Sequence, residues 1–229
     1  MGNEFASIAK DGSVTAIGNV YGAGFAKIVY SFDRIAIASG RSLYFYDRNR
    51  LEKATDADFG DVVDICFIDG YFVTTDGEFI VSTEITDQTK VVPLKYGSSE
   101  KDPDPITGVE KIRGELCVLN RYTIEFFQNV GGAYFPFQVI DGALIQKGCI
   151  SPSAKCQYAE SIAFVGGGKN ESIGIYIAGN SSAVKISSKD IDALIDGYAE
   201  EQLKDVLLES ITINSEELLL VHLSDRTLV

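Results

Sequence analysis

A β-rich unit that recurs five times constrains this chain more than any other feature. Its clearest copy lies between Ile112 and Asn129, where the apolar run Leu116 to Leu119 is followed by a polar turn and a second strand-like run, Thr123 to Phe127. Two β-rich runs separated by a few turn residues are typical of a hairpin. The first runs of the five copies begin at Ile35, Tyr71, Leu116, Ile162 and Leu218.

A further strand-like run precedes each copy, so every unit is expected to be a meander. These runs are Lys27 to Tyr30, Val63 to Ile68, Ile106 to Ile112, Ala154 to Tyr158 and Val206 to Ile213. Successive copies begin 36, 45, 46 and 56 residues apart, a period typical of propeller blades. The sequence therefore predicts an all-β fold, a β-propeller of five or six blades built from antiparallel meanders, with the runs that begin at Ile35 and its counterparts as inner strands. A β-sandwich is the alternative, and it would break the repeat.

The two ends of the chain bear on the number of blades. Phe5 to Lys10 and Ser13 to Ile17 predict a hairpin around the turn Asp11-Gly12. The fifth unit stops at Val229 without an outer strand. The N-terminal hairpin either supplies that strand or belongs to a sixth blade. We expect residues 1–229 to form a single propeller domain that is a fragment of a longer chain, whose C-terminal part is missing.

Polar and helical segments separate the units. Residues 47–61 hold Asp56, Asp58 and Asp61, a spacing that resembles a calcium-binding loop. The fifth position of such a loop is a glycine here, and no glutamate stands at its closing position. A solvated connection between blades is therefore favoured. The segment from Thr86 to Pro105 is polar, contains several charges and has two prolines near its end. It is therefore predicted to be an exposed loop.

A short helical insertion is predicted near residues 187–205. Ser187 and Asp190 resemble a capping box, and Ile191, Leu194 and Ile195 share one face. Gly197 ends this helix, and Ala199 to Asp205 predicts a second helical turn. The insertion accounts for the longest spacing between units.

No motif in the sequence specifies a reaction, cofactor or metal. The glycines near Gly22 lack the third glycine and the helix of a dinucleotide site, and Gly166 to Asn170 lacks the glycine spacing and the hydroxyl residue of a phosphate loop. The single histidine, His222, lies on an apolar strand and is expected to be packed in a blade. We therefore predict no catalytic, cofactor-binding or metal-binding residues.

The cysteines and the carboxylates are the remaining candidates for a reactive or binding site. Cys66, Cys117, Cys149 and Cys156 form no C-x-x-C pair and are expected to be reduced thiols, although Cys149 and Cys156 flank one loop. A glycosidase would use two carboxylates in the propeller channel, and its candidates are Asp64, Asp69, Asp76 and Glu78. Turn chemistry explains Asp69 and Asp76 without catalysis.

The charge and hydropathy of the chain restrict its partners. The formal net charge of −13 argues against non-specific DNA binding, which depends on neutralising phosphates. No apolar run approaches the roughly 18 residues of a membrane span, and no signal peptide is visible. These features are typical of a soluble chain made in a cytosol, without membrane or sequence-specific nucleic-acid binding.

Several segments of the second half follow in the order seen in one known family. They are Thr123 to Phe127, Ile145 to Gly148, Ser161 to Phe164, Ile175 to Gly179, Leu207 to Ser210 and Glu217 to Leu223. Together they resemble the packaged-DNA stabilisation proteins, or tail accessory and hub factors, of short-tailed phages of the Salmonella podovirus type. The resemblance is clear over residues 105–229. It is weaker over residues 1–104, where Val62 to Ile65 and Asp69 to Tyr71 carry it.

The resemblance implies structural work in a virion. Members of the family form a ring beneath the portal and its adaptor ring, connect these to the tail needle and tailspikes, and help retain packaged DNA. It implies a location in the tail, with assembly in the host cytoplasm, and no enzyme activity. We expect contacts through Thr86 to Pro105, Val130 to Lys147 and Ser187 to Gln202. The alternative function is a propeller that binds or cleaves a glycan, which a channel with paired carboxylates would favour.

Overall fold

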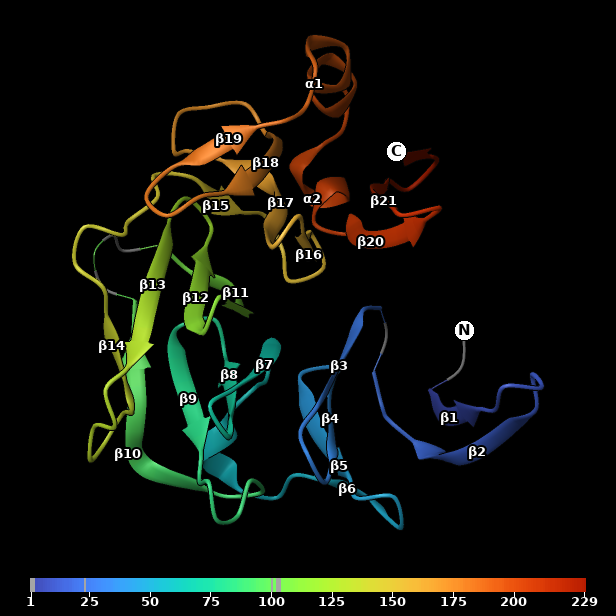
Figure 1. The fold of residues 1–229 in the computed structure, drawn as a ribbon, viewed down its shortest axis with the longest axis vertical. Coiled ribbons are helices and arrows are strands. Elements are labelled where there is room, and N and C mark those ends of the chain that lie inside the picture. Colours follow the sequence, from blue (N-terminus) through green and yellow to red (C-terminus); the bar gives the residue numbers. More distant parts are fainter. Residues whose placement is uncertain (1–2, 23, 100, 102–103) are drawn as a thin grey trace.

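The computed structural model describes residues 3–22, 24–99, 101 and 104–229. Its strands form five antiparallel sheets that follow one another around a common centre, and a separate two-stranded sheet near the N-terminus (Figure 1). The five sheets are the blades of a propeller, numbered here in chain order. The predicted β-propeller is therefore confirmed, and the β-sandwich alternative is wrong.

The first three blades have four strands each, and the last two differ. Blade 1 comprises β3 (Ala26–Tyr30), β4 (Ile35–Ser39), β5 (Ser42–Tyr46) and β6 (Leu51–Lys53). Blade 2 comprises β7 (Asp64–Ile68), β8 (Tyr71–Thr75), β9 (Phe79–Thr83) and β10 (Val91–Ser98). Blade 3 comprises β11 (Ile106–Ile112), β12 (Glu115–Asn120), β13 (Ile124–Asn129) and β14 (Phe137–Val139). Blade 4 comprises β15 (Gly148–Cys149), β16 (Lys155–Tyr158), β17 (Ser161–Gly167), β18 (Gly174–Ala178) and β19 (Ala183–Lys185), and blade 5 comprises β20 (Leu207–Ile213), β21 (Glu216–His222) and β22 (Thr227–Leu228).

The innermost strands are not those that the sequence pattern indicated. The strand that opens each meander lies nearest the centre: β7 contacts β3 and β11, and β16 contacts β20 (Figure 1). The strands that begin at Ile35 and Tyr71 are the second strands of their blades. The prediction of inner strands is therefore wrong by one position. The second strands hold the longer apolar runs, such as Ile162 to Val165 of β17, whereas the opening strand β16 also carries Lys155 and Gln157. Hydropathy alone therefore points to the wrong strand of the pair.

The hydrophobic core lies between the faces of adjacent blades. One cluster of buried side chains joins blades 1 and 2 and includes Ala36, Phe45, Ile65 and Phe72. A second cluster joins blades 2 and 3, and the largest extends from blade 3 across blade 4 to Leu208 of blade 5. Face-to-face packing of this kind explains why the strands of the central blades are apolar on both faces.

The predicted exposed loop from Thr86 to Pro105 contains β10, so this prediction is wrong for Val91–Ser98. β10 is the outermost strand of blade 2 and pairs only with β9 among the described strands. An edge strand with a solvent-facing side tolerates polar residues and proline, here Pro93. Residues 100, 102 and 103 of the predicted loop lie outside the described residues.

The helical insertion lies between blades 4 and 5, as predicted. It contains α1 (Lys189–Ile195) and α2 (Glu200–Leu203). The N-cap of α1 is Ser188, whose side chain accepts a hydrogen bond from the Ile191 amide. The predicted cap at Ser187 is therefore wrong by one residue, because Ser187 Oγ accepts from the Ile175 amide and donates to Asp192. Neither described helix has the length and hydropathy needed to cross a membrane.

The N-terminal hairpin forms as predicted, from β1 (Glu4–Ile8) and β2 (Val14–Asn19). Its turn is fixed by Asp11 Oδ1, which accepts a hydrogen bond from the Ser13 amide at 2.9 Å, and by a positive φ at Gly12. Within the described residues it is a sheet of its own and does not pair with blade 5. Of the two alternatives for this hairpin, the structure therefore rejects the outer strand of blade 5.

Candidate functional site

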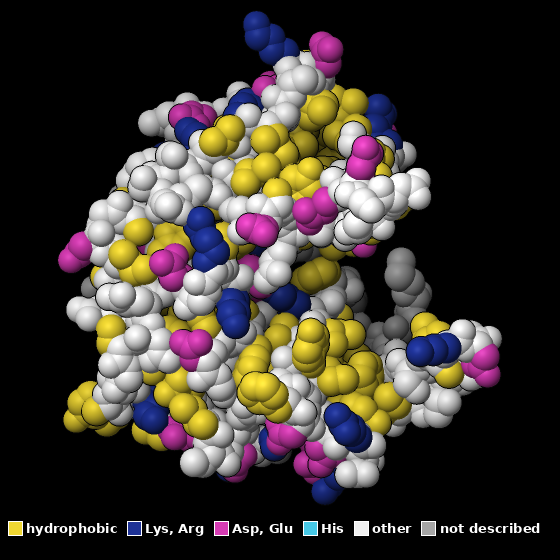
Figure 2. All heavy atoms as spheres, viewed as in Figure 1, with side chains coloured by type: hydrophobic (Ala, Val, Ile, Leu, Met, Phe, Trp, Pro, Cys, Tyr) yellow, Lys and Arg dark blue, Asp and Glu magenta, His cyan; other side chains and the backbone are white. Residues whose placement is uncertain are grey.

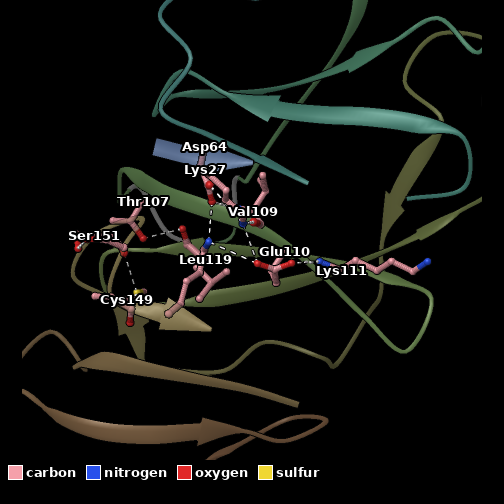
Figure 3. Close-up of polar contacts among 12 residues, drawn as sticks. Lys27, Asp64, Thr107, Val109, Glu110, Lys111, Leu119, Cys149 and Ser151 are labelled. Atoms are coloured by element: carbon pink, nitrogen blue, oxygen red, sulfur yellow. Dashed lines mark hydrogen bonds and ion pairs between the residues drawn. The ribbon is translucent and has the colours of Figure 1, made fainter. Parts of the chain in front are cut away.

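Four charged side chains meet on the axis, where the first strands of blades 1 to 4 converge (Figure 3). They are Lys27 of β3, Asp64 of β7, Glu110 of β11 and Lys155 of β16. Lys155 Nζ lies 2.8 Å from Asp64 Oδ2, and Lys27 Nζ lies 2.8 Å from Glu110 Oε2. The cross pairs are longer, with Lys27 Nζ 3.4 Å from Asp64 Oδ1 and Lys155 Nζ 3.7 Å from Glu110 Oε2. We call these four residues the axial cluster.

The axial cluster is buried and tightly enclosed. The side chains of Asp64 and Lys155 are 0% and 1% exposed. The Val109 amide donates to Asp64 Oδ2 at 2.8 Å, and Lys27 Nζ donates to the Val109 carbonyl at 3.3 Å. A Cβ at Gly108 would lie 2.6 Å from Lys155 Cε and 2.7 Å from Asp64 Oδ2, so only glycine fits there. Charged groups and backbone therefore fill the axis at this level.

The cluster has two positive and two negative groups, so its formal charges cancel. Burial alone would raise the pKa of Glu110, but the ammonium groups of Lys27 and Lys155 outweigh it and lower that pKa to about 2. Burial alone would lower the pKa of Lys27, but Asp64 and Glu110 outweigh it and raise that pKa. Lys27 and Glu110 are therefore charged at neutral pH. A buried pair of this kind persists because each charge has a close partner.

This arrangement does not suit the glycosidase alternative. A glycosidase needs one carboxyl group whose raised pKa keeps it protonated, and a second carboxylate across the bond to be cleaved. Glu110 has a lowered pKa, and both carboxylates of the cluster are occupied by lysines. The axial cluster therefore joins four blades by ion pairs. It does not contain the protonated acid and free carboxylate that glycoside hydrolysis requires.

The other predicted carboxylates lie in turns away from the cluster. Asp69 occupies a turn with a positive φ and accepts a hydrogen bond from Asn129 Nδ2 at 3.0 Å. Asp76 Oδ1 accepts from the amides of Glu78 and Phe79 at 2.9 and 2.7 Å. Glu78 is exposed in the same turn as Asp76, so of the four candidates only Asp64 reaches the axis. The turn interpretation holds for Asp69 and Asp76.

Neither the acidic residues of the first connection nor the cysteines form a reactive site. Asp56 accepts hydrogen bonds from the amides of Asp58 and Val91, and the described residues contain no group of three metal-ligating side chains. All four cysteines are free thiols. Burial raises the pKa of Cys149 to about 11 and that of Cys156 to about 12, so both stay protonated at neutral pH.

His222 lies on β21, as expected for a residue packed in a blade. Its Nε2 lies 3.0 Å from Glu209 Oε1, and its Nδ1 lies 2.9 Å from Thr227 Oγ1. Both partners belong to blade 5, on the strands that flank β21. The histidine therefore links three strands of one blade.

Two of the three expected contact regions lie side by side on the rim. Leu94 and Tyr96 of β10 are 62% and 53% exposed, in the first region. Phe135, in the second region, lies against Gly97, where a Cβ would come within 2.5 Å of its ring. Tyr134 is 66% exposed beside it. We call Leu94, Tyr96, Tyr134 and Phe135 the apolar rim.

The third expected region, from Ser187 to Gln202, is polar and lies on blade 4. Arg121 bonds Glu200 of α2 at 3.1 Å, and Lys185 bonds Asp192 of α1 at 2.7 Å. A pocket of about 320 Å³ lies between Arg121, Lys169 and this insertion. The insertion is thus tied to blades 3 and 4 by ion pairs.

Sequence reasoning singled out Asp64 but missed Lys27, Glu110 and Lys155. The partners come from strands that are far apart in the chain, so no local motif contains them. A signal was nevertheless present, because each residue is a charge within the short first strand of its own unit. Lys27, Asp64 and Lys155 are the first or second residues of their strands, so aligning the strand starts would have brought these three together, whereas Glu110 is the fifth residue of β11 and would have been missed.

The comparisons with known proteins assign a family to this fold. The family described as "Bacteriophage P22 Gp10, beta-propeller" matches residues 1–229. The chain belongs to this family. The tail hub protein gp10 of Salmonella phage P22 is 28% identical over 187 residues, a match that covers 76% of this chain and 38% of that protein. The chain thus spans less than half of the length of that curated relative.

Among solved structures, PorZ shares the fold of this Gp10 family member. PorZ of Porphyromonas gingivalis, a surface component of the type-IX secretion system, has a TM-score of 0.53 and 14% identity, with 99% of this chain and 29% of PorZ covered. Hsv2 of Kluyveromyces lactis has a TM-score of 0.48 and 12% identity, with 97% of this chain and 74% of Hsv2 covered. At such identities the likeness to PorZ concerns the fold alone.

Proposed function

We propose that this chain is a non-enzymatic structural protein of a phage tail. In this role it helps close the portal vertex and retain packaged DNA, because it connects the portal and its adaptor ring to the tail needle and tailspikes. The observation that carries the proposal is the family match over residues 1–229. The P22 relative is a tail hub protein, which supports a location in the tail of the virion. We propose that the chain reaches it after assembly in the host cytoplasm.

The axis of the propeller supports a structural role. Four blades contribute one charge each to the axial cluster, which locks their first strands together at a neutral, buried point. Blades joined in this way keep their relative positions under load. A glycan-binding or glycan-cleaving propeller is the alternative function, and none of the contacts of the axial cluster favours it.

The apolar rim is the surface that best fits contact with a protein ring. Leu94, Tyr96 and Tyr134 are large apolar side chains that are more than half exposed, and they come from two expected contact regions. Large apolar side chains exposed on neighbouring strands and loops are candidates for protein interaction sites. The polar insertion with α1 and α2 is a second contact region, and self-association into a ring would use these outer surfaces because the blade interiors are occupied.

The net charge of −13 fits this role in two ways. Acidic surfaces repel DNA at the exit of the capsid, and they attract basic protein partners. We propose no sequence-specific contact with nucleic acid and no contact with a membrane.

Binding to isolated portal–adaptor rings tests the proposal. The chain should co-sediment with the rings, and the double variant Leu94→Lys/Tyr96→Lys should bind at least about tenfold more weakly, because two apolar anchors are lost from the contact. Val14→Lys on β2 is a matched control, since Val14 is 66% exposed but lies in the N-terminal hairpin, outside the expected contact regions. It should bind like the unaltered chain.

Two results would count against the proposal. If the unaltered chain does not sediment with the rings, the tail role is wrong for this chain. If both the rim variant and the Val14 variant bind as tightly as the unaltered chain, the apolar rim is not the contact surface. Binding to a panel of polysaccharides, measured in parallel, would support the glycan alternative.

A further inference from the structure

The propeller is open on one side, between blade 5 and the N-terminal hairpin. Figure 1 shows the two walls of this opening at the right of the molecule, and Figure 2 shows the surface hollowed there, with hydrophobic side chains gathered over blade 1. We call this opening the blade cleft. The walls are sheet faces of opposite ends of the chain, and each carries apolar residues.

The wall on blade 1 is only half covered. Its register places Ile28 of β3, Ile37 of β4 and Tyr44 of β5 on one face. The hairpin covers the outer strands, where Ile37 and Tyr44 are 1% and 3% exposed and share a cluster with Val20 and Phe5. On the innermost strand, Ile28 and Tyr30 remain 56% and 75% exposed. The hairpin therefore occupies the outer half of a blade position and leaves the inner half empty.

The wall on blade 5 carries apolar residues on both faces, although Glu209 and His222 also lie on the face away from blade 4. One face packs Leu208 and Val221 into the core shared with blade 4. The other face carries Ile211, Leu218 and Leu220, and Ile211 pairs with Leu218 across the two strands. None of these three residues belongs to a core cluster of the described residues. Strands that are apolar on both faces are typical of a sheet covered on both sides. Blade 5 is thus built to pack against a further sheet.

The path of the chain shows how many strands this further sheet lacks. In blades 1 and 2 the outermost strand, β6 or β10, leads to the innermost strand of the next blade. The chain leaves β2 and enters β3, the innermost strand of blade 1, so β2 holds the place of an outermost strand. β1 pairs only with β2 among the described strands, and its inner edge is free. Two inner strands would complete a four-stranded blade like blades 1 to 3.

We propose that the blade cleft binds a β-hairpin that pairs with the free edge of β1 and completes a sixth blade. One face of that hairpin packs on Ile28 and Tyr30, and its other face packs on Ile211 and Leu218. The occupant is a segment from the remaining length of the family's polypeptide. The P22 relative has such length, because the matched segment is 38% of that protein. Strand addition supplies main-chain hydrogen bonds, and the apolar walls supply burial.

The test supplies that segment as a separate chain. The 229-residue protein is co-expressed with the part of the P22 tail hub protein that lies outside the matched segment. We expect a one-to-one complex by light scattering and protection of the β1 amides in hydrogen exchange. We also expect the Tm to rise by roughly 5–10 °C when the fragment is present at about a hundred times its Kd.

Variants in the cleft separate specific binding from non-specific association. Leu218→Lys and Tyr30→Lys place a charge on each wall and should abolish the complex, while the fold of the free chain is kept because both side chains are partly or largely exposed. Val184→Lys, on an exposed strand of blade 4, should bind as the unaltered chain does.

Other outcomes overturn the proposal. Absence of a complex with unprotected β1 amides would show that the family's own segment does not fill the cleft. A dimer of the 229-residue chain, disrupted by Leu218→Lys, would assign the cleft to a second copy. The inference stands apart from the tail role, since the cleft can close whether or not the chain binds portal–adaptor rings.

Discussion

At the scale of single residues, the axial cluster is where the structure adds most to the sequence. Asp64 was noticeable as a charge in an apolar run, but its purpose depends on Lys27 and Lys155, which belong to other blades. No window of sequence contains all three, so their meeting follows only from the closure of the blades. Turn residues such as Asp76 were predictable, because they bond to amides two and three residues away.

Removing one lysine from the cluster should destabilise the fold strongly. In Lys155→Met, the buried Asp64 carboxylate loses its 2.8 Å partner. Lys27, 3.4 Å from the other oxygen, remains. Removing one partner of a buried ion pair costs about 3–5 kcal/mol in free energy of unfolding, and we expect a loss towards the lower end of this range. Urea unfolding measures this loss. Lys10→Met, at an exposed position in the hairpin, should change the free energy of unfolding by less than about 0.5 kcal/mol. Equal effects of the two variants would contradict the role of the cluster.

The cluster should also make stability depend on pH in the acidic range. The pKa of Glu110 is about 2 in the folded chain and about 4.3 in an unfolded one, so the folded state favours the charged form. Its stabilisation is present above the unfolded pKa and is lost as pH falls from about 4.3 towards 2. Glu110→Gln should therefore be less stable than the unaltered chain at neutral pH, and this difference should shrink over that window. Thermal unfolding at several pH values measures it, and a difference that stays constant to pH ~2.5 would refute the assignment.

At the scale of strands and helices, element type was easier to predict than element boundaries. The N-terminal hairpin and the helical insertion were predictable from turn chemistry and from the spacing of Ile191, Leu194 and Ile195. β10 was not, because an edge strand has one neighbour and one solvent-facing side, and its sequence therefore carries proline and polar residues. The cap of α1 was misplaced because two serines adjoin and only one has the geometry of a cap.

The cap assignment gives a prediction at this scale. Ser188→Ala removes the oxygen that accepts from the Ile191 amide at 3.3 Å and should lower the free energy of unfolding by about 1 kcal/mol. Ser181→Ala, at an exposed position in the turn before β19, is the matched control and should have almost no effect. Chemical unfolding of both variants measures the difference. A loss as large for Ser181→Ala as for Ser188→Ala would argue against the cap.

At the scale of the whole molecule, the period of the repeat was sufficient to predict a propeller. Its five units correspond to blades 1 to 5, since each meander must bury two apolar faces and can do so only between neighbours. The order of strands from axis to rim was not predictable from hydropathy, because the second strands hold the longer apolar runs while the first strands carry the charges of the axial cluster. The open side of the propeller could not be predicted from the sequence either, because the exposure of Ile28 and Tyr30 depends on which sheet lies opposite them.

The central claim, that this propeller is a structural part of a phage tail, is tested most directly by negative-stain microscopy of the chain mixed with portal–adaptor rings. Our account predicts an additional layer of density on the adaptor end of the rings, and none when the Leu94→Lys/Tyr96→Lys variant replaces the unaltered chain. Rings without added density, with the chain left as free particles, would contradict the claim.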